Sequence, residues 1–291
     1  MSTFLQLLLR SLETGGIFAL ASLGIIIIYR TSNMTNFALG SIGMFNAFAV
    51  TVLYLKAGVP LGWATLIGMV IAFVVGIALD VVLIRHTKKA TPVARQILTL
   101  GLIMIFLGIA PMFYGVDPLR LPQFIPTGSL SIAGANISYN GLFNIVLGLV
   151  IMLVLFYFLQ KTKWGLAVRT TASNEYTARL MGVPTKTVTM GAWAVAAMLA
   201  TLAGVMTAPF TSVTLNLMDN VQINALIACV FGGFQSFYGP VLAAYIIGIS
   251  KNLLAFYVDS KWADQLLYIG ILIFIVFRPY GLIGKKIVKK V

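Results

Sequence analysis

Charged residues are scarce in this chain and make up 9% of its 291 residues. Soluble domains carry about 25%, so this sequence has too little charge to cover an ordinary globular surface. Cysteine and histidine occur once each, as Cys229 and His86. A single cysteine excludes a disulfide framework and a thiol metal site.

Residue types that carry catalysis are equally sparse. His86 lies in the basic stretch 85–89 without a carboxylate partner, which is typical of a solvated loop residue rather than a catalytic base. No Ser/His/Asp set and no metal-ligand cluster can be assembled, and the nucleotide-binding pattern Gly-x4-Gly-Lys-Ser/Thr does not occur. We therefore predict that the chain is not an enzyme and has no catalytic, cofactor-binding or metal site.

Hydrophobic residues make up 60% of the chain, and the mean hydropathy is +0.99. Repeated apolar runs of about 20 residues match the hydrocarbon core of a bilayer, where the backbone must pair internally as helices. We predict an all-α, polytopic transmembrane bundle that forms one domain over residues 1–291. After an amphipathic lead at 1–12, the expected spans are 14–30, 35–55, 61–84, 93–114, 141–160, 188–210, 220–234, 239–257 and 264–281. The runs 35–55 and 220–234 are rich in glycine and polar residues; if one of them is broken, the number of full crossings falls from nine to eight.

The net charge is +13, from 20 basic and 7 acidic residues. On a soluble chain such a charge suggests nucleic acid, but cytoplasmic loops of membrane proteins also collect Lys and Arg, and we favour that explanation. With residues 85–92 inside, fifteen basic residues fall on the cytoplasmic side: Arg30, Arg85, Lys88, Lys89, Arg95, Lys161, Lys163, Arg169, Arg179, Lys186, Arg278, Lys285, Lys286, Lys289 and Lys290. This uneven distribution of basic residues between the two sides predicts a multi-pass protein of the plasma membrane with its N-terminus outside and its C-terminus inside.

Residues 161–187 form the only long polar stretch with a helical composition, and the stretch is strongly basic. Ser173 or Asn174 can cap a helix of about two turns, Glu175 favours its N-terminal end, and Gly182 ends it. The helix has a small apolar face, made of Ala178, Leu180 and Met181. A helix lying on lipid headgroups is one interpretation. The small size of the apolar face favours the other, a docking site for a cytosolic partner.

Asp80 stands near the expected cytoplasmic end of the span 61–84. An ionisable group inside a span is a functional candidate, but no second acid or histidine continues a proton relay from it. We favour a salt bridge with Arg85 or Lys88 near the membrane surface.

Small residues mark two helix faces. Asn36, Gly40, Gly43 and Ala47 share one face, which serves either helix packing or the wall of a pore, and the two interpretations stay open. A second face is free of polar residues and is predicted to serve packing alone: Ala196, Ala200, Gly204 and Ala208.

The segment 232–240, Gly-Gly-Phe-Gln-Ser-Phe-Tyr-Gly-Pro, cannot be helical throughout, because Pro240 lacks a backbone donor and disfavours helical geometry at Gly239. We predict a buried break or a cytoplasmic turn between two spans.

Five motifs run in order along nearly the whole chain. They are Asn-Phe-Ala-Leu-Gly at 36–40, Thr-Leu-Gly at 99–101, Arg-x4-Asn-Glu-x5-Met-Gly at 169–182, Gly-Gly-x2-Ser-x2-Gly-Pro at 232–240 and Arg-Pro-Tyr-Gly-Leu at 278–282. Together they resemble the membrane subunits of bacterial ABC importers of the branched-chain amino acid family, in particular the H-type permeases. Two positions depart from the family pattern: Leu39 replaces a histidine, and Gln235 replaces a glycine, which leaves the substrate open.

The resemblance implies a pore-forming permease subunit of an ATP-driven amino-acid importer, with branched-chain amino acids as the first choice of substrate. It implies as partners a second permease chain, similar or identical, two cytosolic ATPases that bind the ATP, and an external solute-binding protein. The ATPases would hold a coupling helix within the loop 161–187, with the residues Arg169, Asn174, Glu175, Arg179, Met181 and Gly182. For the translocation pathway we select Asn36, Ser41, Asn46, Thr99, Gln222 and Asn224. The alternative is a stand-alone channel or a secondary carrier for a small polar solute.

Overall fold

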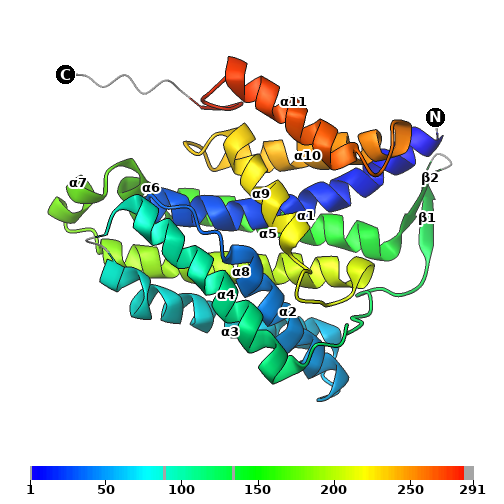
Figure 1. Ribbon diagram of the computed structural model, residues 1–291, viewed down its shortest axis with the longest axis horizontal. Helices are drawn as coiled ribbons and strands as arrows, with labels where there is room; N and C mark the ends of the chain where they lie inside the picture. The colour runs from blue at the N-terminus through cyan, green and yellow to red at the C-terminus, as the bar shows by residue number, and fades with distance from the viewer. Residues whose placement is uncertain (1, 88–89, 133–134, 285–291) are drawn as a thin grey trace.

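The computed structural model describes residues 2–87, 90–132 and 135–284, and it is an all-α membrane bundle with one small β-hairpin (Figure 1). The α-helices are α1 (Ser2–Ser32), α2 (Leu39–Leu55), α3 (Leu61–Val82), α4 (Pro92–Tyr114), α5 (Tyr139–Lys161), α6 (Lys163–Ser173), α7 (Glu175–Leu180), α8 (Thr185–Thr211), α9 (Asp219–Gly232), α10 (Tyr238–Tyr257) and α11 (Ala263–Phe277). A short 3-10 helix, η1 (Ile84–Thr87), follows α3, and the antiparallel strands are β1 (Ser129–Ile132) and β2 (Ala135–Ser138). Of the basic residues counted above, Lys88, Lys89, Lys285, Lys286, Lys289 and Lys290 lie outside the described residues.

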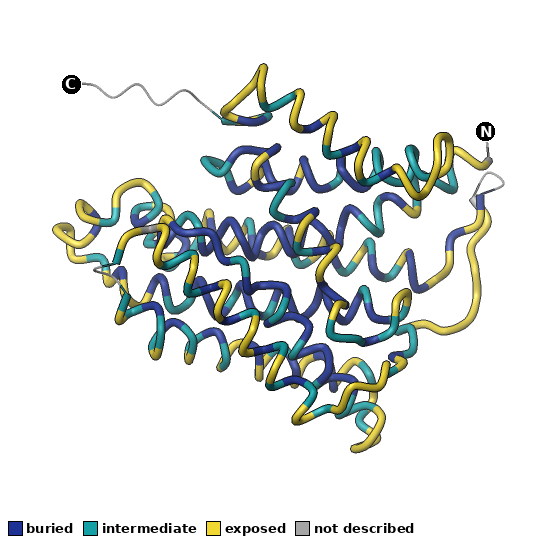
Figure 2. The backbone as a smooth tube through the Cα atoms, viewed as in Figure 1, coloured by how far each residue is buried: buried dark blue, intermediate teal, exposed yellow. Residues whose placement is uncertain are grey.

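Helices α1 and α8 form the centre of the bundle. In their most apolar stretches 83% and 78% of the residues are buried, against 28%, 22% and 28% in α3, α4 and α5 (Figure 2). The outer helices therefore present apolar side chains outward, which is the arrangement expected of helices that contact lipid or another membrane chain. Among the described residues, six helices are long and apolar enough to cross a membrane, and α2 and α11 are shorter apolar helices.

Small residues let the central helices approach one another closely. A Cβ on Gly43 of α2 would lie 2.6 Å from the carbonyl oxygen of Ala200 in α8, and a Cβ on Gly204 would lie 3.2 Å from the carbonyl oxygen of Gly43. The predicted packing role of the face from Ala196 to Ala208 is thereby confirmed. For the face that runs from Asn36 to Ala47, the choice between helix packing and a pore wall is decided in part, because Gly43 packs against α8.

Several expected boundaries were wrong. Residues 1–12 are no separate lead, since the described residues from Ser2 onward belong to the continuous helix α1. The span expected at 35–55 begins only at Leu39, because the chain first doubles back toward the middle of the bundle (Figure 1). The β-hairpin between α4 and α5 was not foreseen; Leu130 pairs with Ile137 there.

The predicted break at 232–240 is confirmed. Helix α9 ends at Gly232, α10 begins at Tyr238, and Gly233 adopts a positive φ of 92°. The backbone N–H groups of Leu282 and Ile283 donate to the carbonyl oxygens of Phe231 and Gly232, at 2.8 and 3.3 Å. The turn that follows α11 therefore satisfies carbonyl groups at the end of α9, as a helix end inside a membrane protein requires.

Candidate functional site

Helix α7 and the two residues after it form a small projection from one end of the bundle (Figure 1). The side chain of Asn174 accepts a hydrogen bond from the backbone N–H of Thr177 at 3.0 Å and caps α7, as the sequence predicted. Gly182 has a φ of 79°, which lets the chain turn sharply after the helix. The polar stretch contains a second helix, α6, where the sequence analysis expected only one.

One side of the projection is anchored, and the other is exposed. Ala178 was expected to belong to the exposed apolar face of the helix, but it is 2% exposed and packs against the protein. Leu180 and Met181 are 72% and 76% exposed. Tyr176, which the sequence analysis missed, is 73% exposed. Its position four residues before Leu180, on the same helix face, was the available signal.

Arg179 fixes α7 to the start of α8. It forms an ion pair with Glu175, and its Nε donates to the hydroxyl oxygen of Thr185 at 2.9 Å. The hydroxyl of Thr189, one turn further along α8, donates to the carbonyl oxygen of Thr185 at 2.6 Å. The first turn of α8 thus connects the projection directly to a central helix.

Arg169, which was grouped with the coupling residues, lies on α6 rather than on α7. Its Nη2 donates to the carbonyl oxygen of Gln160, in the last turn of α5, at 3.2 Å. Its guanidinium is therefore held toward α5. Arg169 also precedes the exposed residues of the projection by several positions in the sequence.

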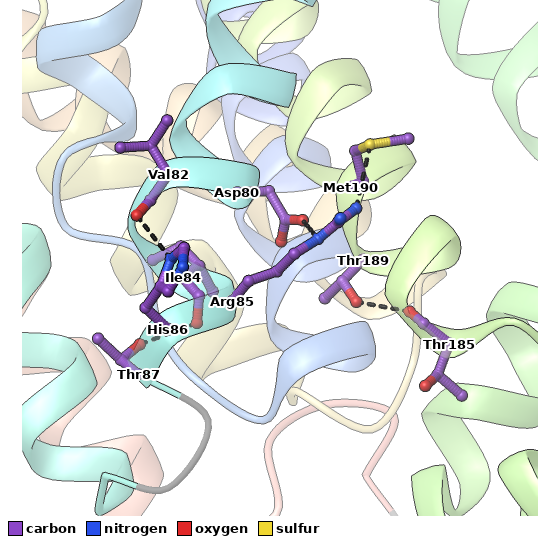
Figure 3. A network of polar contacts seen from close by, with 9 residues as sticks. All are labelled: Asp80, Val82, Ile84, Arg85, His86, Thr87, Thr185, Thr189 and Met190. Carbon is purple, nitrogen blue, oxygen red and sulfur yellow. Dashed lines mark hydrogen bonds and ion pairs between the residues drawn. The ribbon is translucent and has the colours of Figure 1, made fainter.

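The predicted salt bridge of Asp80 is confirmed with Arg85, one of its two predicted partners. The Nε of Arg85 lies 3.3 Å from Oδ2 of Asp80, and its Nη2 lies 3.3 Å from the sulfur of Met190 in α8 (Figure 3). Figure 3 also shows Thr185 and Thr189 on the neighbouring turns of α8. Arg85 therefore pairs with Asp80 at the end of α3 and also contacts Met190, in the second turn of α8. Lys88, the other expected partner, lies outside the described residues.

Replacing Arg85 with methionine is expected to destabilise the protein by about 2 kcal/mol, less than the roughly 3–5 kcal/mol of a fully buried pair, because the Arg85 side chain is 31% exposed. The carboxylate of Asp80 is 1% exposed, so it would lose a cation that it meets away from water. Thermal unfolding in detergent measures the effect. Adding Asp80→Asn to Arg85→Met should recover most of the loss, and a double variant as unstable as the single one would contradict this account.

Three of the six residues selected for the pathway meet where α2 begins. The backbone N–H of Phe37 donates to the hydroxyl of Thr99 in α4 at 3.2 Å, and Nε2 of Gln222 in α9 donates to the carbonyl oxygen of Asn36 at 3.4 Å. A Cβ on Gly40 would lie 2.9 Å from Cβ of Gln222. The short helices α2 and α9 are therefore joined by polar contacts inside the bundle.

The other three selected residues lie apart from this cluster. Ser41 is half-buried, and Asn46 is buried and donates to the carbonyl oxygen of Ile42 in its own helix at 2.8 Å. Asn224 donates to the carbonyl oxygen of Asn220 at 2.8 Å and accepts from the hydroxyl of Tyr268 at 3.4 Å. The structure thus divides the selected residues among several places and forms no single site from them.

A cavity of about 800 Å³ opens at the end of the bundle opposite α7, beside β2 and the first turns of α1 (Figure 1). Its lining includes Glu13, Asn220 and Lys251. Nζ of Lys251 lies 2.7 Å from Asp264 and 3.0 Å from Oδ1 of Asn220. The sequence placed Lys251 in a span, but it could not show the partners that hold its charge, because they belong to α9 and α11.

Comparison with known proteins agrees with this architecture. Residues 7–276 match the family described as branched-chain amino acid transport system, permease component. The probable branched-chain amino acid transport permease protein LivH of Methanocaldococcus jannaschii is 26% identical over 286 residues, which cover 92% of this chain and 89% of that protein. The high-affinity branched-chain amino acid transport system permease proteins LivH of Escherichia coli and BraD of Pseudomonas aeruginosa are each 25% identical, over 99% of this chain and 98% of their own length.

No solved structure matches the fold at a significant level. The family match covers nearly the whole chain, from the second turn of α1 to the last turn of α11. This chain therefore belongs to the family of permease components of branched-chain amino acid transport systems.

Proposed function

We propose that the chain is the pore-forming transmembrane subunit of an ATP-driven importer for amino acids, branched-chain ones in particular. The names of its relatives support the substrate class. The observation that carries the proposal is the exposed projection at α7. It presents Tyr176, Leu180 and Met181 outside the apolar bundle and is bonded through Arg179 to a central helix. Such a projection can transmit the movement of a bound ATPase to the membrane helices.

We place the end of the bundle that carries α7 in the cytoplasm of a bacterial plasma membrane, with the N-terminus outside and the C-terminus inside. The bias of Lys and Arg toward cytoplasmic loops supports this orientation. Arg30, Arg85, Arg95 and Lys161 all stand where helices end or begin at the α7 end (Figure 1). The six long helices together with α2 and α11 would give eight crossings, and the shorter α9 would be the ninth.

The partners in this proposal are a second permease chain, two cytosolic ATPases at the projection and an external solute-binding protein. The chain itself would bind no cofactor and catalyse no reaction, because the ATPases would bind the ATP. The whole chain would act as a single permease domain, in which residues 161–187 form the cytoplasmic coupling loop. Its coupling residues would be Asn174, Glu175, Arg179, Met181 and Gly182, with Arg169 at the base of the loop.

We place the translocation pathway between the cavity beside Lys251 and the contacts of Asn36, Thr99 and Gln222. Polar and ionisable groups inside a membrane bundle are costly and mark solute pathways. The network of Lys251, Asn220 and Asn224 leads along α9 from the cavity toward Gln222, which stands two residues before Asn224. Ser41 and Asn46 stay as further predicted lining residues.

Reconstitution into liposomes tests this function against a stand-alone channel or carrier. Vesicles that contain the chain, its second permease, the ATPases and the binding protein should accumulate leucine only when ATP is supplied. Vesicles with this chain alone should show no flux above protein-free vesicles. Flux from the chain alone, independent of nucleotide, would favour the channel or carrier instead.

A further inference from the structure

We propose that a pocket between the end of α5, helix α6 and the start of α10 binds the phosphate headgroup of an anionic phospholipid. The pocket has a volume of about 410 Å³. Two cations line it, Lys161 and Arg169, together with the aromatic rings of Phe156, Phe237 and Tyr238. We call it the α5–α10 pocket.

The charge of the pocket has one sign. Lys161 is the last residue of α5, and Arg169 comes from α6, so two separate elements each bring a cation to it. No acidic side chain lines the pocket, and neither cation forms an ion pair within the described part of the chain. Arg169 gives one donor to the carbonyl oxygen of Gln160, and a guanidinium has five. The remaining donors suit a phosphate group.

The walls of the pocket favour a lipid over a free phosphate ion. The rings of Phe156 and Tyr238 stack with their centroids 4.7 Å apart. Beside Phe156 on α5, Leu153, Val154 and Tyr157 are 66%, 61% and 68% exposed, so apolar side chains lie exposed in the turns of α5 that precede Lys161. An acyl chain can lie along this surface while the headgroup meets the cations.

The position of the pocket at the end of α5 agrees with a bound lipid headgroup. Lys161 ends a helix of 23 residues, which is about the length needed to cross the hydrocarbon core, so its ammonium lies where headgroups begin. Basic pockets between membrane helices on the cytoplasmic side are known lipid sites. Because α6 leads directly to α7, a bound headgroup would hold the base of the projection against α5 and α10.

Native mass spectrometry of the full-length protein, purified with mixed phosphatidylglycerol and phosphatidylcholine, tests the proposal. The wild type should retain phosphatidylglycerol, and the double variant Lys161→Gln/Arg169→Gln should retain about tenfold less. Lys163→Gln is the matched control, because Lys163 is an exposed cation next to the pocket that does not line it. Equal retention in the double variant and in the control would overturn the proposal.

Two measurements on the wild type keep the test independent of how the variant folds. A photoreactive phosphatidylglycerol should label the peptides that contain the end of α5 or the start of α10, and labelling spread evenly over the apolar surface would overturn the proposal. Phosphatidylglycerol should also raise the unfolding temperature where inorganic phosphate does not. Equal protection by phosphate alone would show a site for a free anion and not for a lipid.

Discussion

Replacing Leu180 and Met181 with aspartate is expected to reduce ATP-driven transport strongly while the protein stays folded in the membrane. Both side chains are more than 70% exposed, at 72% and 76%, so these substitutions remove little packing within the folded chain itself. In an interface with an ATPase, truncating one apolar side chain at a hot spot costs about 2 kcal/mol or more of binding free energy. The two aspartate carboxylates would be buried in this interface, which adds a desolvation cost to ATPase binding. We expect the transport rate to fall by more than about tenfold.

Leucine uptake and ATPase activity of the reconstituted complex measure this result together. Uptake should fall by more than about tenfold, while binding of the solute-binding protein at the opposite end should be kept. Glu175→Arg and Gly182→Pro should uncouple transport in the same way, because Glu175 pairs with Arg179 and Gly182 has a φ of 79° that proline cannot adopt. Wild-type uptake in these variants would remove the basis of the importer proposal.

Val116→Asp is a suitable control for the charge itself. Val116 is 75% exposed, nearly the same as Met181, but it lies in the connection between α4 and β1, away from the projection. We expect this variant to keep its coupling of transport to ATP hydrolysis. An equal loss of transport in the control would show that a surface carboxylate disturbs the protein in general.

Replacing Gly239 with alanine should destabilise the break between α9 and α10. A Cβ at this position would overlap with the carbonyl group of Gly232, and the neighbouring atom is backbone that cannot rotate away. Overpacking of this kind costs about 1–3 kcal/mol or more, so the midpoint of thermal unfolding should fall by roughly 5–10 °C. Fluorescence-detected size exclusion after a heating series gives the midpoint.

Gly270→Ala is the matched control for this prediction. Gly270 also lies in a membrane helix, α11, but no atom lies within 4 Å of the position that its Cβ would take. Alanine is the better helix former, so this variant should be as stable as the wild type or slightly more stable. If both variants have the same midpoint, the close approach of Gly232 and Gly239 does not limit stability.

The local features were predictable where a single segment contains its own cause. Asn174 and Gly182 mark the start and end of α7 because caps and positive-φ turns depend on neighbouring residues. The pair of Asp80 and Arg85 was predictable for the same reason, since it joins positions five apart in the chain. Helix α6 was missed, because it directly follows α5 and only Thr162 separates the two.

Contacts between distant segments were not predictable in the same way. The sequence grouped six polar residues as one pathway, yet only Asn36, Thr99 and Gln222 meet. The other three lie on α2 and α9 as well, but Asn46 and Asn224 make their hydrogen bonds elsewhere. Arg169 was assigned to the coupling helix by its motif, although its side chain reaches back to Gln160. A motif fixes the order of residues, but the direction of a side chain depends on the helices packed around it.

By itself, the sequence determined that this chain is a helical membrane protein, since an apolar run of sufficient length can meet the needs of its backbone in a bilayer only as a helix. It also determined the small polar projection, whose capping and turn residues act over a few positions. The tertiary structure alone decided which helices are central, where α2 and α9 begin inside the bundle, and which cations share a pocket with Phe156 and Tyr238. These properties arise from close packing between segments that lie far apart in the sequence, as Arg30 and Gln235 do, and no local pattern encodes such contacts.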